Sequence, residues 1–148
     1  MPLPKDRPFP TDIADLIRKS AEFTPYTALT GLKVERVEWG LVTVRLPFRE
    51  EVSRSFGILH GGAIMTLMDV AGGLASATAV EEWHPGLTNV TIASSAQFLS
   101  VARGVDVIAL GRCTKAGKSI KFCDVEVTAE GETIARGAFT FKTTQMSV

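Results

Sequence analysis

One charged side chain, Asp69, lies in the middle of an otherwise apolar and small-residue run. The run, residues 61–80, reads GGAIMTLMDVAGGLASATAV. It has the length of one helix of roughly 30 Å, and a helix that is apolar on nearly all sides must be buried by the rest of the fold. Because an unpaired carboxylate is costly to bury, we expect Asp69 to have a functional role. A desolvated carboxylate suits a general base or a nucleophile.

The same run has the length of a membrane span, but its composition does not fit one. It holds four glycines and a central aspartate. Neither a Trp/Tyr belt nor a Lys/Arg cluster flanks both of its ends. We therefore expect a helix buried inside a sheet, and no membrane partner.

Size and composition favour one globular domain over residues 1–148. Hydrophobic residues make up 45% of the chain, and the formal net charge is zero. The balanced charge argues against a nucleic-acid partner. The start of the chain, MPLPKDRPFP, has no apolar signal segment, so we expect a cytoplasmic protein. Its two cysteines, Cys113 and Cys123, are then expected to be reduced core or cross-strand neighbours, with no metal-ligand spacing.

The remaining segments have the patterns of one short helix and several strands. Within an N-terminal extension, residues 1–30, Thr11 or Asp12 can cap a helix that runs through Ser20. Alternating residues and turn signals predict six strands in a core of residues 31–143, at 32–38, 41–47, 87–99, 104–114, 120–129 and 132–142. This order predicts an α+β fold in which an antiparallel sheet wraps one long helix.

The run FGILHGG, residues 56–62, precedes Asp69, which stands nine positions after His60. This motif and the order of elements resemble the hotdog-fold acyl-CoA thioesterases, in particular the PaaI-type and 4-hydroxybenzoyl-CoA thioesterase branch. The resemblance covers about residues 30–142. It implies hydrolysis of a small-molecule acyl- or aryl-CoA thioester to the free acid and CoA, with no cofactor and no metal.

The resemblance also implies roles for single residues. The backbone N–H of Gly61 would polarise the thioester carbonyl, and Asp69 would attack that carbonyl or activate water. Thr91, found by counting back from Phe98 and Leu99, would help to place the water. The turn of Gly117, Lys118 and Ser119 corresponds to a turn that often contacts CoA.

Elementary chemistry supports the same pairing and adds a constraint. Thioester hydrolysis needs donors aimed at the carbonyl oxygen and a base or nucleophile near the carbon. The helix N-terminus at Gly61 and Gly62 offers free N–H groups, and His60 is expected to orient the helix start by a hydrogen bond. Gly61 and Asp69 lie roughly 12 Å apart along one helix, too far to touch one carbonyl. We therefore predict a twofold dimer in which Gly61 of one copy meets Asp69 of the other, and the resemblance implies further doubling into a tetramer.

Residues three or four positions from Asp69 share its side of the helix. They are Met65, Thr66, Gly72 and Gly73, and the glycines leave space for an acyl chain or an aromatic ring. We expect the substrate to contact Met65 and Gly73 on this face, together with His60, Gly62 and Arg54. Arg54 stands where the resembling family often has Asn or Gln. It can stabilise an oxyanion, hold Asp69 ionised or point to solvent.

Lys115, Lys118 and Lys121 surround Gly117, and this turn either binds phosphates or is a solvated hairpin. Asp69 itself has a structural alternative, in which it caps a loop or pairs with Arg54.

Two other functions compete with a thioesterase. A non-catalytic acyl-CoA sensor or carrier on the same fold is the main alternative. A hydratase is disfavoured because the chain has only His60 and His84 and lacks an Asp-x-Asn-x-x-His pattern.

Overall fold

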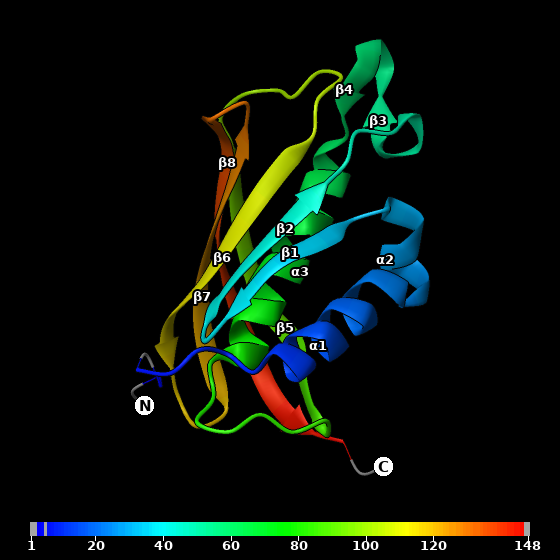
Figure 1. The fold of residues 1–148 in the computed structure, drawn as a ribbon. Helices are drawn as coiled ribbons and strands as arrows, with labels where there is room; N and C mark the ends of the chain where they lie inside the picture. Colours follow the sequence, from blue (N-terminus) through cyan, green and yellow to red (C-terminus); the bar gives the residue numbers. More distant parts are fainter. Residues whose placement is uncertain (1–2, 5, 147–148) are drawn as a thin grey trace.

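The fold is one long helix wrapped by a curved antiparallel sheet, as expected. A computed structural model describes residues 3–4 and 6–146. The long helix, α3, spans Gly61–Thr78 and crosses the concave side of a six-stranded sheet with the order β1-β2-β6-β7-β8-β5 (Figure 1). The strands are β1 (Lys33–Glu38), β2 (Leu41–Leu46), β5 (Leu87–Phe98), β6 (Val107–Ala116), β7 (Ile120–Ala129) and β8 (Glu132–Gln145). Every neighbouring pair in this sheet is antiparallel.

Strand periodicity explains why the sheet has one buried face. In β7, the side chains of Cys123, Val125 and Val127 are buried and the intervening Asp124 and Glu126 are exposed. The inward row packs on α3, and the outward row faces solvent. The turn that follows has left-handed backbone at Glu130 (φ 49°) and Gly131 (φ 80°), the geometry of a tight two-residue hairpin. This turn lies where the predicted strands 120–129 and 132–142 require one.

Glycine lets the helix and the sheet approach closely. A Cβ on Gly111 of β6 would lie 2.3 Å from the backbone oxygen of Ala71 in α3. A Cβ on Gly72 would lie 3.1 Å from Phe141 of β8. Both positions therefore exclude side chains for reasons of packing. Gly72 serves contact with the sheet, so the expectation that it opens space beside Asp69 is wrong.

Two helices precede the sheet, where the sequence predicted one. The first, α1, spans Thr11–Phe23 and begins after Pro10 without a side-chain cap, so the capping role expected for Thr11 or Asp12 is wrong. The second, α2, spans Pro25–Thr30. Within the part of the chain described, no helix is long and apolar enough to cross a membrane.

Side chains of α1 cover the outer edge of β1. The Arg18 Nε donates to the Val34 carbonyl at 2.8 Å, and the Val34 N–H donates to Glu22 Oε1 at 2.9 Å. An open strand edge presents unpaired backbone groups, and these two bonds satisfy them at Val34. The helix is thereby fixed beside the sheet.

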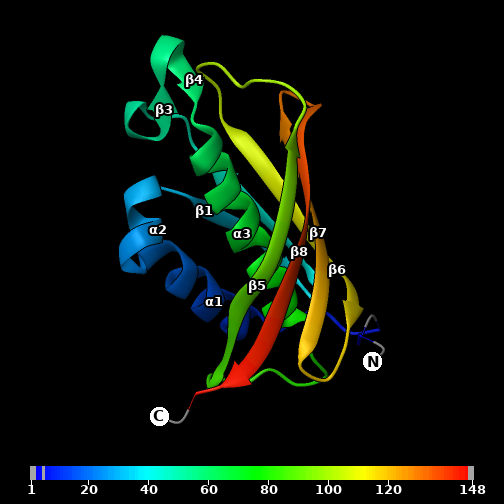
Figure 2. The ribbon, with the colours of Figure 1, turned by 180° about the vertical axis from the view of Figure 1, so that it is seen from behind.

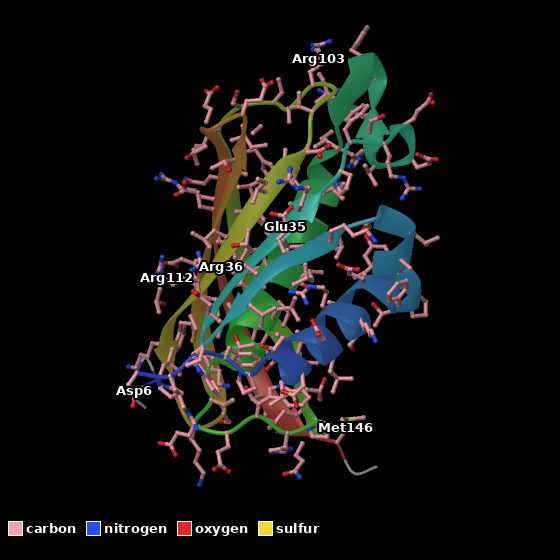
Figure 3. All side chains as sticks on the ribbon, in the orientation of Figure 1. Asp6, Glu35, Arg36, Arg103, Arg112 and Met146 are labelled. Carbon is pink, nitrogen blue, oxygen red and sulfur yellow. The ribbon has the colours of Figure 1, made fainter. Side chains whose placement is uncertain are left out.

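The segment 48–58, which lies between β2 and α3, is ordered. It contains two 3₁₀ turns (Glu50–Val52 and Ser55–Gly57) and a second, two-stranded sheet of β3 (Ser53–Arg54) and β4 (Ile58–Leu59). Its backbone is left-handed at Phe56 and Gly57, with φ of 68° and 66°. Arg103, at the same end of the molecule (Figure 3), donates a 2.8 Å hydrogen bond to the Phe56 carbonyl. This bond helps to fix the segment that leads into α3.

Candidate active site

The N-terminus of α3 offers one free backbone donor. His60 is the N-cap, and its Nδ1 accepts a 2.8 Å hydrogen bond from the Gly62 N–H. The N–H groups of Ala63 and Ile64 donate to the His60 carbonyl at 2.9 and 3.1 Å. Among the described residues, no acceptor faces the Gly61 N–H. The first turn therefore presents this single N–H to a ligand.

The two glycines at the helix start have different roles. A Cβ on Gly61 would have only the Phe98 ring nearby, at 3.9 Å, so the space beside this residue is open. A Cβ on Gly62 would lie 2.9 Å from His60 Nδ1. Because the Gly62 N–H is also used by His60, this glycine keeps the cap intact. The expected role of His60 in orienting the helix start by a hydrogen bond is confirmed, and a contact of His60 or Gly62 with substrate stays a prediction.

Asp69 is held by a residue from the neighbouring strand. The Thr91 hydroxyl of β5 donates a 2.7 Å hydrogen bond to Asp69 Oδ1. In a single chain Asp69 is half-buried, so it is more exposed than a residue on a helix that is enclosed on all sides. Figure 2 shows α1 and β5 on either side of α3, and Asp69 lines a groove together with residues of these two elements. The second carboxylate oxygen has no hydrogen-bond partner among the described residues.

A groove of about 480 Å³ begins at Asp69 and contains one of the predicted substrate residues. Gly73 lines it, and Met65 does not. Met65 is half-buried and packs against the main core. Gly73 and Asp69 are four residues apart on one helix face, so the bare backbone of Gly73 lies next to the carboxylate in the groove.

The structure separates the remaining predicted residues from Asp69. Arg54 lies in β3, is exposed, and forms no ion pair with any described residue. The turn of Gly117, Lys118 and Ser119 joins β6 to β7, at the end of the molecule opposite to β3 and β4 (Figure 1). The Ser119 carbonyl accepts a 2.7 Å hydrogen bond from the Thr143 N–H. Within one chain, this turn is therefore remote from Gly61.

Lys121 differs from the other two lysines near Gly117, and phosphate binding at this turn stays a prediction. Its side chain is buried, and its Nζ donates a 2.9 Å hydrogen bond to the Ser76 carbonyl of α3. Burial lowers the pKa of Lys121. The neighbouring turn then retains Lys115 and Lys118 as its exposed cations.

The two cysteines are cross-strand neighbours, as predicted. Cys113 and Cys123 face each other on β6 and β7. A hydrogen bond from the Cys123 thiol and the nearby Lys121 ammonium lower the pKa of Cys113. The same hydrogen bond and burial raise the pKa of Cys123. Neither thiol lines the groove at Asp69.

Comparisons with known proteins assign the chain to a family. The model of the thioesterase superfamily matches residues 56–135, more than half of the chain. Human acyl-coenzyme A thioesterase 13 is 32% identical over 106 residues, which cover 68% of this chain and 71% of that protein. A thioesterase family protein from Silicibacter pomeroyi has the same fold, with a TM-score of 0.80 at 23% identity over 90% of this chain and 98% of that one.

A further solved structure contains a ligand. This protein from Streptococcus mutans, bound to acetyl-CoA, has a TM-score of 0.69 at 28% identity, over 79% of this chain and 91% of that one. The predicted hotdog fold and the predicted class of thioester hydrolase are confirmed by these matches. The chain therefore belongs to the thioesterase superfamily, as residues 56–62 and Asp69 indicated.

Proposed function

We propose that this protein hydrolyses the thioester of a small-molecule acyl- or aryl-CoA to a free acid and CoA. One observation carries the proposal. In a chain of the thioesterase superfamily, the single unused N–H at the start of α3 and a carboxylate held by Thr91 lie on the same helix. The named activity of the human relative and the acetyl-CoA in the Streptococcus mutans structure support CoA thioesters as substrates.

The active site is built from two copies of the chain. Eight residues separate Gly61 from Asp69 on α3, which places them about 12 Å apart. A thioester carbonyl that accepts a hydrogen bond from the Gly61 N–H must also lie within roughly 3 Å of the Asp69 carboxylate. Antiparallel packing of α3 against α3 of a second copy brings Gly61 of each chain to Asp69 of its partner and gives two equal sites.

The edge of the sheet supports this assembly. In the described chain, β5 pairs with β8 only, so its other edge is open (Figure 2). Val90 and Ile92 on this strand are 52% and 53% exposed, and Phe98 is 50% exposed. An open, apolar edge strand favours pairing with another chain. A second copy that pairs along β5 would lie close to Asp69, because Thr91 of this strand is bonded to that carboxylate.

In this arrangement, each group has a defined task. The Gly61 N–H donates to the thioester oxygen and stabilises the negative charge that develops there. Asp69 either takes a proton from the water that attacks the carbonyl carbon, or attacks that carbon itself to form an anhydride that water then cleaves. Thr91 orients the carboxylate through Oδ1. The C–S bond breaks, and the CoA thiolate leaves and is protonated.

The CoA end is proposed to reach the turn of Gly117, Lys118 and Ser119. Lys118 is exposed and lines a hollow beside the end of α3, together with Arg7 and Lys121 and with the carboxylates of Glu81 and Glu82. Phosphate binding there must overcome the repulsion from these carboxylates. The cytoplasmic location, the contact of Arg54 with substrate and the doubling of dimers into a tetramer stay predictions.

The proposal is tested by thiol release from a panel of short, medium and aromatic acyl-CoAs. We expect wild-type turnover, and we expect Asp69→Asn to lower kcat by at least a hundredfold while the protein still binds acyl-CoA. Asp124→Asn, an exposed aspartate on the outer face of β7, is the matched control. Binding by calorimetry without any thiol release from the wild type would instead identify a sensor or carrier.

A further inference from the structure

A groove beside Asp69 is lined by apolar side chains from three parts of the fold. Its floor is the face of α3 formed by Val70, Gly73, Leu74 and Ala77. One wall is α1 with α2, and the other is the start of β5, with Trp83 and Pro85 from the loop that follows α3. With a volume of about 480 Å³, the groove falls in the range of sites that enclose a small organic ligand.

Asp69 is the only ionisable side chain that lines the groove among the described residues. Two of the polar side chains that line the groove, Asn89 and Thr27, are already bonded within the protein. Asn89 Nδ2 donates to the Gly73 carbonyl at 2.8 Å, and Asn89 Oδ1 accepts from Ser76 at 3.3 Å and from Thr143 at 3.1 Å. Thr27 Oγ1 donates to the Ala21 carbonyl at 2.5 Å. A ligand part that enters here therefore finds no partner for a charge.

The wall made by α1 and α2 is fixed at both ends. At the end near Asp69, the Tyr26 hydroxyl of α2 bonds at 2.8 Å to the hydroxyl of Thr66, which lies one turn before Asp69 on α3. At the other end, Ile17 of α1 belongs to a separate buried cluster that also contacts Leu74 and Trp83. The wall is a built part of the site, because it is tied to the floor on either side.

The length of the groove sets a limit on the ligand. From Asp69 to Ala77 the helix rises by about 12 Å. An extended chain advances by about 3.5 Å for every three bonds, so this distance corresponds to about ten carbons. Trp83 and Pro85, from the loop that follows α3, also line the groove, and Trp83 packs against the same buried cluster as Leu74.

We propose that this groove binds the acyl part of the substrate and measures its length. It selects uncharged, apolar acyl groups of up to about ten carbons, or an aryl-terminated chain of that length, with the thioester carbonyl at Asp69. Acyl groups that end in a carboxylate are rejected, because no cation faces them. This inference rests on the proposed thioesterase function and adds the substrate class.

Two substitutions should change the length preference in opposite directions. Ala77→Leu places three carbons on the floor, and we expect it to lower the decanoyl-to-butanoyl ratio of kcat/KM at least tenfold, with butanoyl-CoA within about threefold of the wild type. Trp83→Ala should raise the tetradecanoyl-to-octanoyl ratio about tenfold. Ala28→Leu, on an exposed position of α2 outside the groove, is the matched control and should change neither ratio.

Binding separates a failure of this inference from a failure of the proposed function. In the Asp69→Asn background, calorimetry with the same acyl-CoA series should show an affinity that rises with chain length up to about ten carbons. Ala77→Leu should abolish that rise. Both results are expected whether or not the wild type releases thiol. Equal ratios and equal affinities for Ala77→Leu and Ala28→Leu would overturn the proposal. Loss of the dimer in Ala77→Leu by size-exclusion chromatography, with the length preference unchanged, would also overturn it, since the groove would then hold the second copy.

Discussion

The Thr91 hydroxyl donates a 2.7 Å hydrogen bond to Oδ1 of Asp69, and so joins the edge strand β5 to the middle of α3. The bond leaves the second carboxylate oxygen of Asp69 free among the described residues. A carboxylate held by one oxygen and open at the other is suited to act on a water or a carbonyl.

This relationship predicts different results for two substitutions of Thr91. Thr91→Val keeps the shape but removes the hydroxyl, and we expect kcat to fall about tenfold with little change in KM. Thr91→Ser keeps the hydroxyl and should retain most of the activity. Steady-state thiol release measures both variants, and an unchanged kcat in Thr91→Val would show that the bond is only structural.

The free N–H at the start of α3 predicts a contrast between proline and alanine at position 61. Proline is favoured at the first helical position, where it removes only the N–H, and His60 already has the extended backbone that precedes proline (ψ 133°). We expect Gly61→Pro to lower kcat by about a hundredfold or more. Gly61→Ala keeps the N–H and has room for its methyl group, so it should stay within about tenfold of the wild type.

These variants also need a folding control. Circular dichroism and thermal unfolding should show that Gly61→Pro retains the helix and the dimer. If the proline variant is folded and turns over as fast as the alanine variant, the Gly61 N–H has no part in stabilising the oxyanion.

The turn between β6 and β7 predicts a difference between two kinds of substrate. If Lys118 contacts the CoA phosphates, Lys118→Ala should raise KM for acyl-CoA several-fold. It should leave hydrolysis of the matching N-acetylcysteamine thioester, which has no phosphates, unchanged. Lys115→Ala tests the other exposed cation of this segment in the same way. Equal effects on both substrates would place the phosphates elsewhere.

The buried Lys121 predicts an effect on stability. Lys121→Met removes a desolvated charge, and the Ser76 carbonyl keeps its 3.2 Å bond from the Ala79 N–H. We therefore expect the free energy of unfolding to be unchanged or to rise by about 1 kcal/mol. Because burial lowers the pKa of Lys121 from its ordinary value of 10.5, the unfolded chain binds more protons just below that pH, and this group makes the wild type more stable as pH rises there.

Denaturant unfolding at several alkaline pH values checks this prediction. The part of the increase in unfolding free energy with pH that comes from Lys121 should be absent from Lys121→Met. A loss of several kcal/mol on substitution would instead mean that the Lys121 hydrogen bond stabilises the end of α3.

The long helix could be predicted from the length of its apolar run, and most of the strands could be predicted from alternating residues between turn signals. The helix α2 and the strands β3 and β4 could not, since segments of two to six residues are too short to show either pattern. Lys121 had a signal that was missed: it shares the inward parity of Cys123 and Val125 on β7, so its burial followed from the same alternation that predicted the strand.

The candidate site was predictable in part for a similar reason. Spacing along one helix gave the separation of Gly61 from Asp69. The acyl groove depends on where α1 packs, and this is set by side-chain bonds such as that from Arg18 to the Val34 carbonyl, which no local pattern reveals.

The shared site is tested most directly by mixing two inactive chains. Gly61→Pro and Asp69→Asn are co-expressed with different affinity tags, and the heterodimer is isolated and assayed for thiol release. In a shared site, one of the two sites combines the intact Gly61 of one chain with the intact Asp69 of the other, so the heterodimer should recover about half of the wild-type kcat per dimer. A heterodimer as inactive as its parents would contradict a site built from two copies.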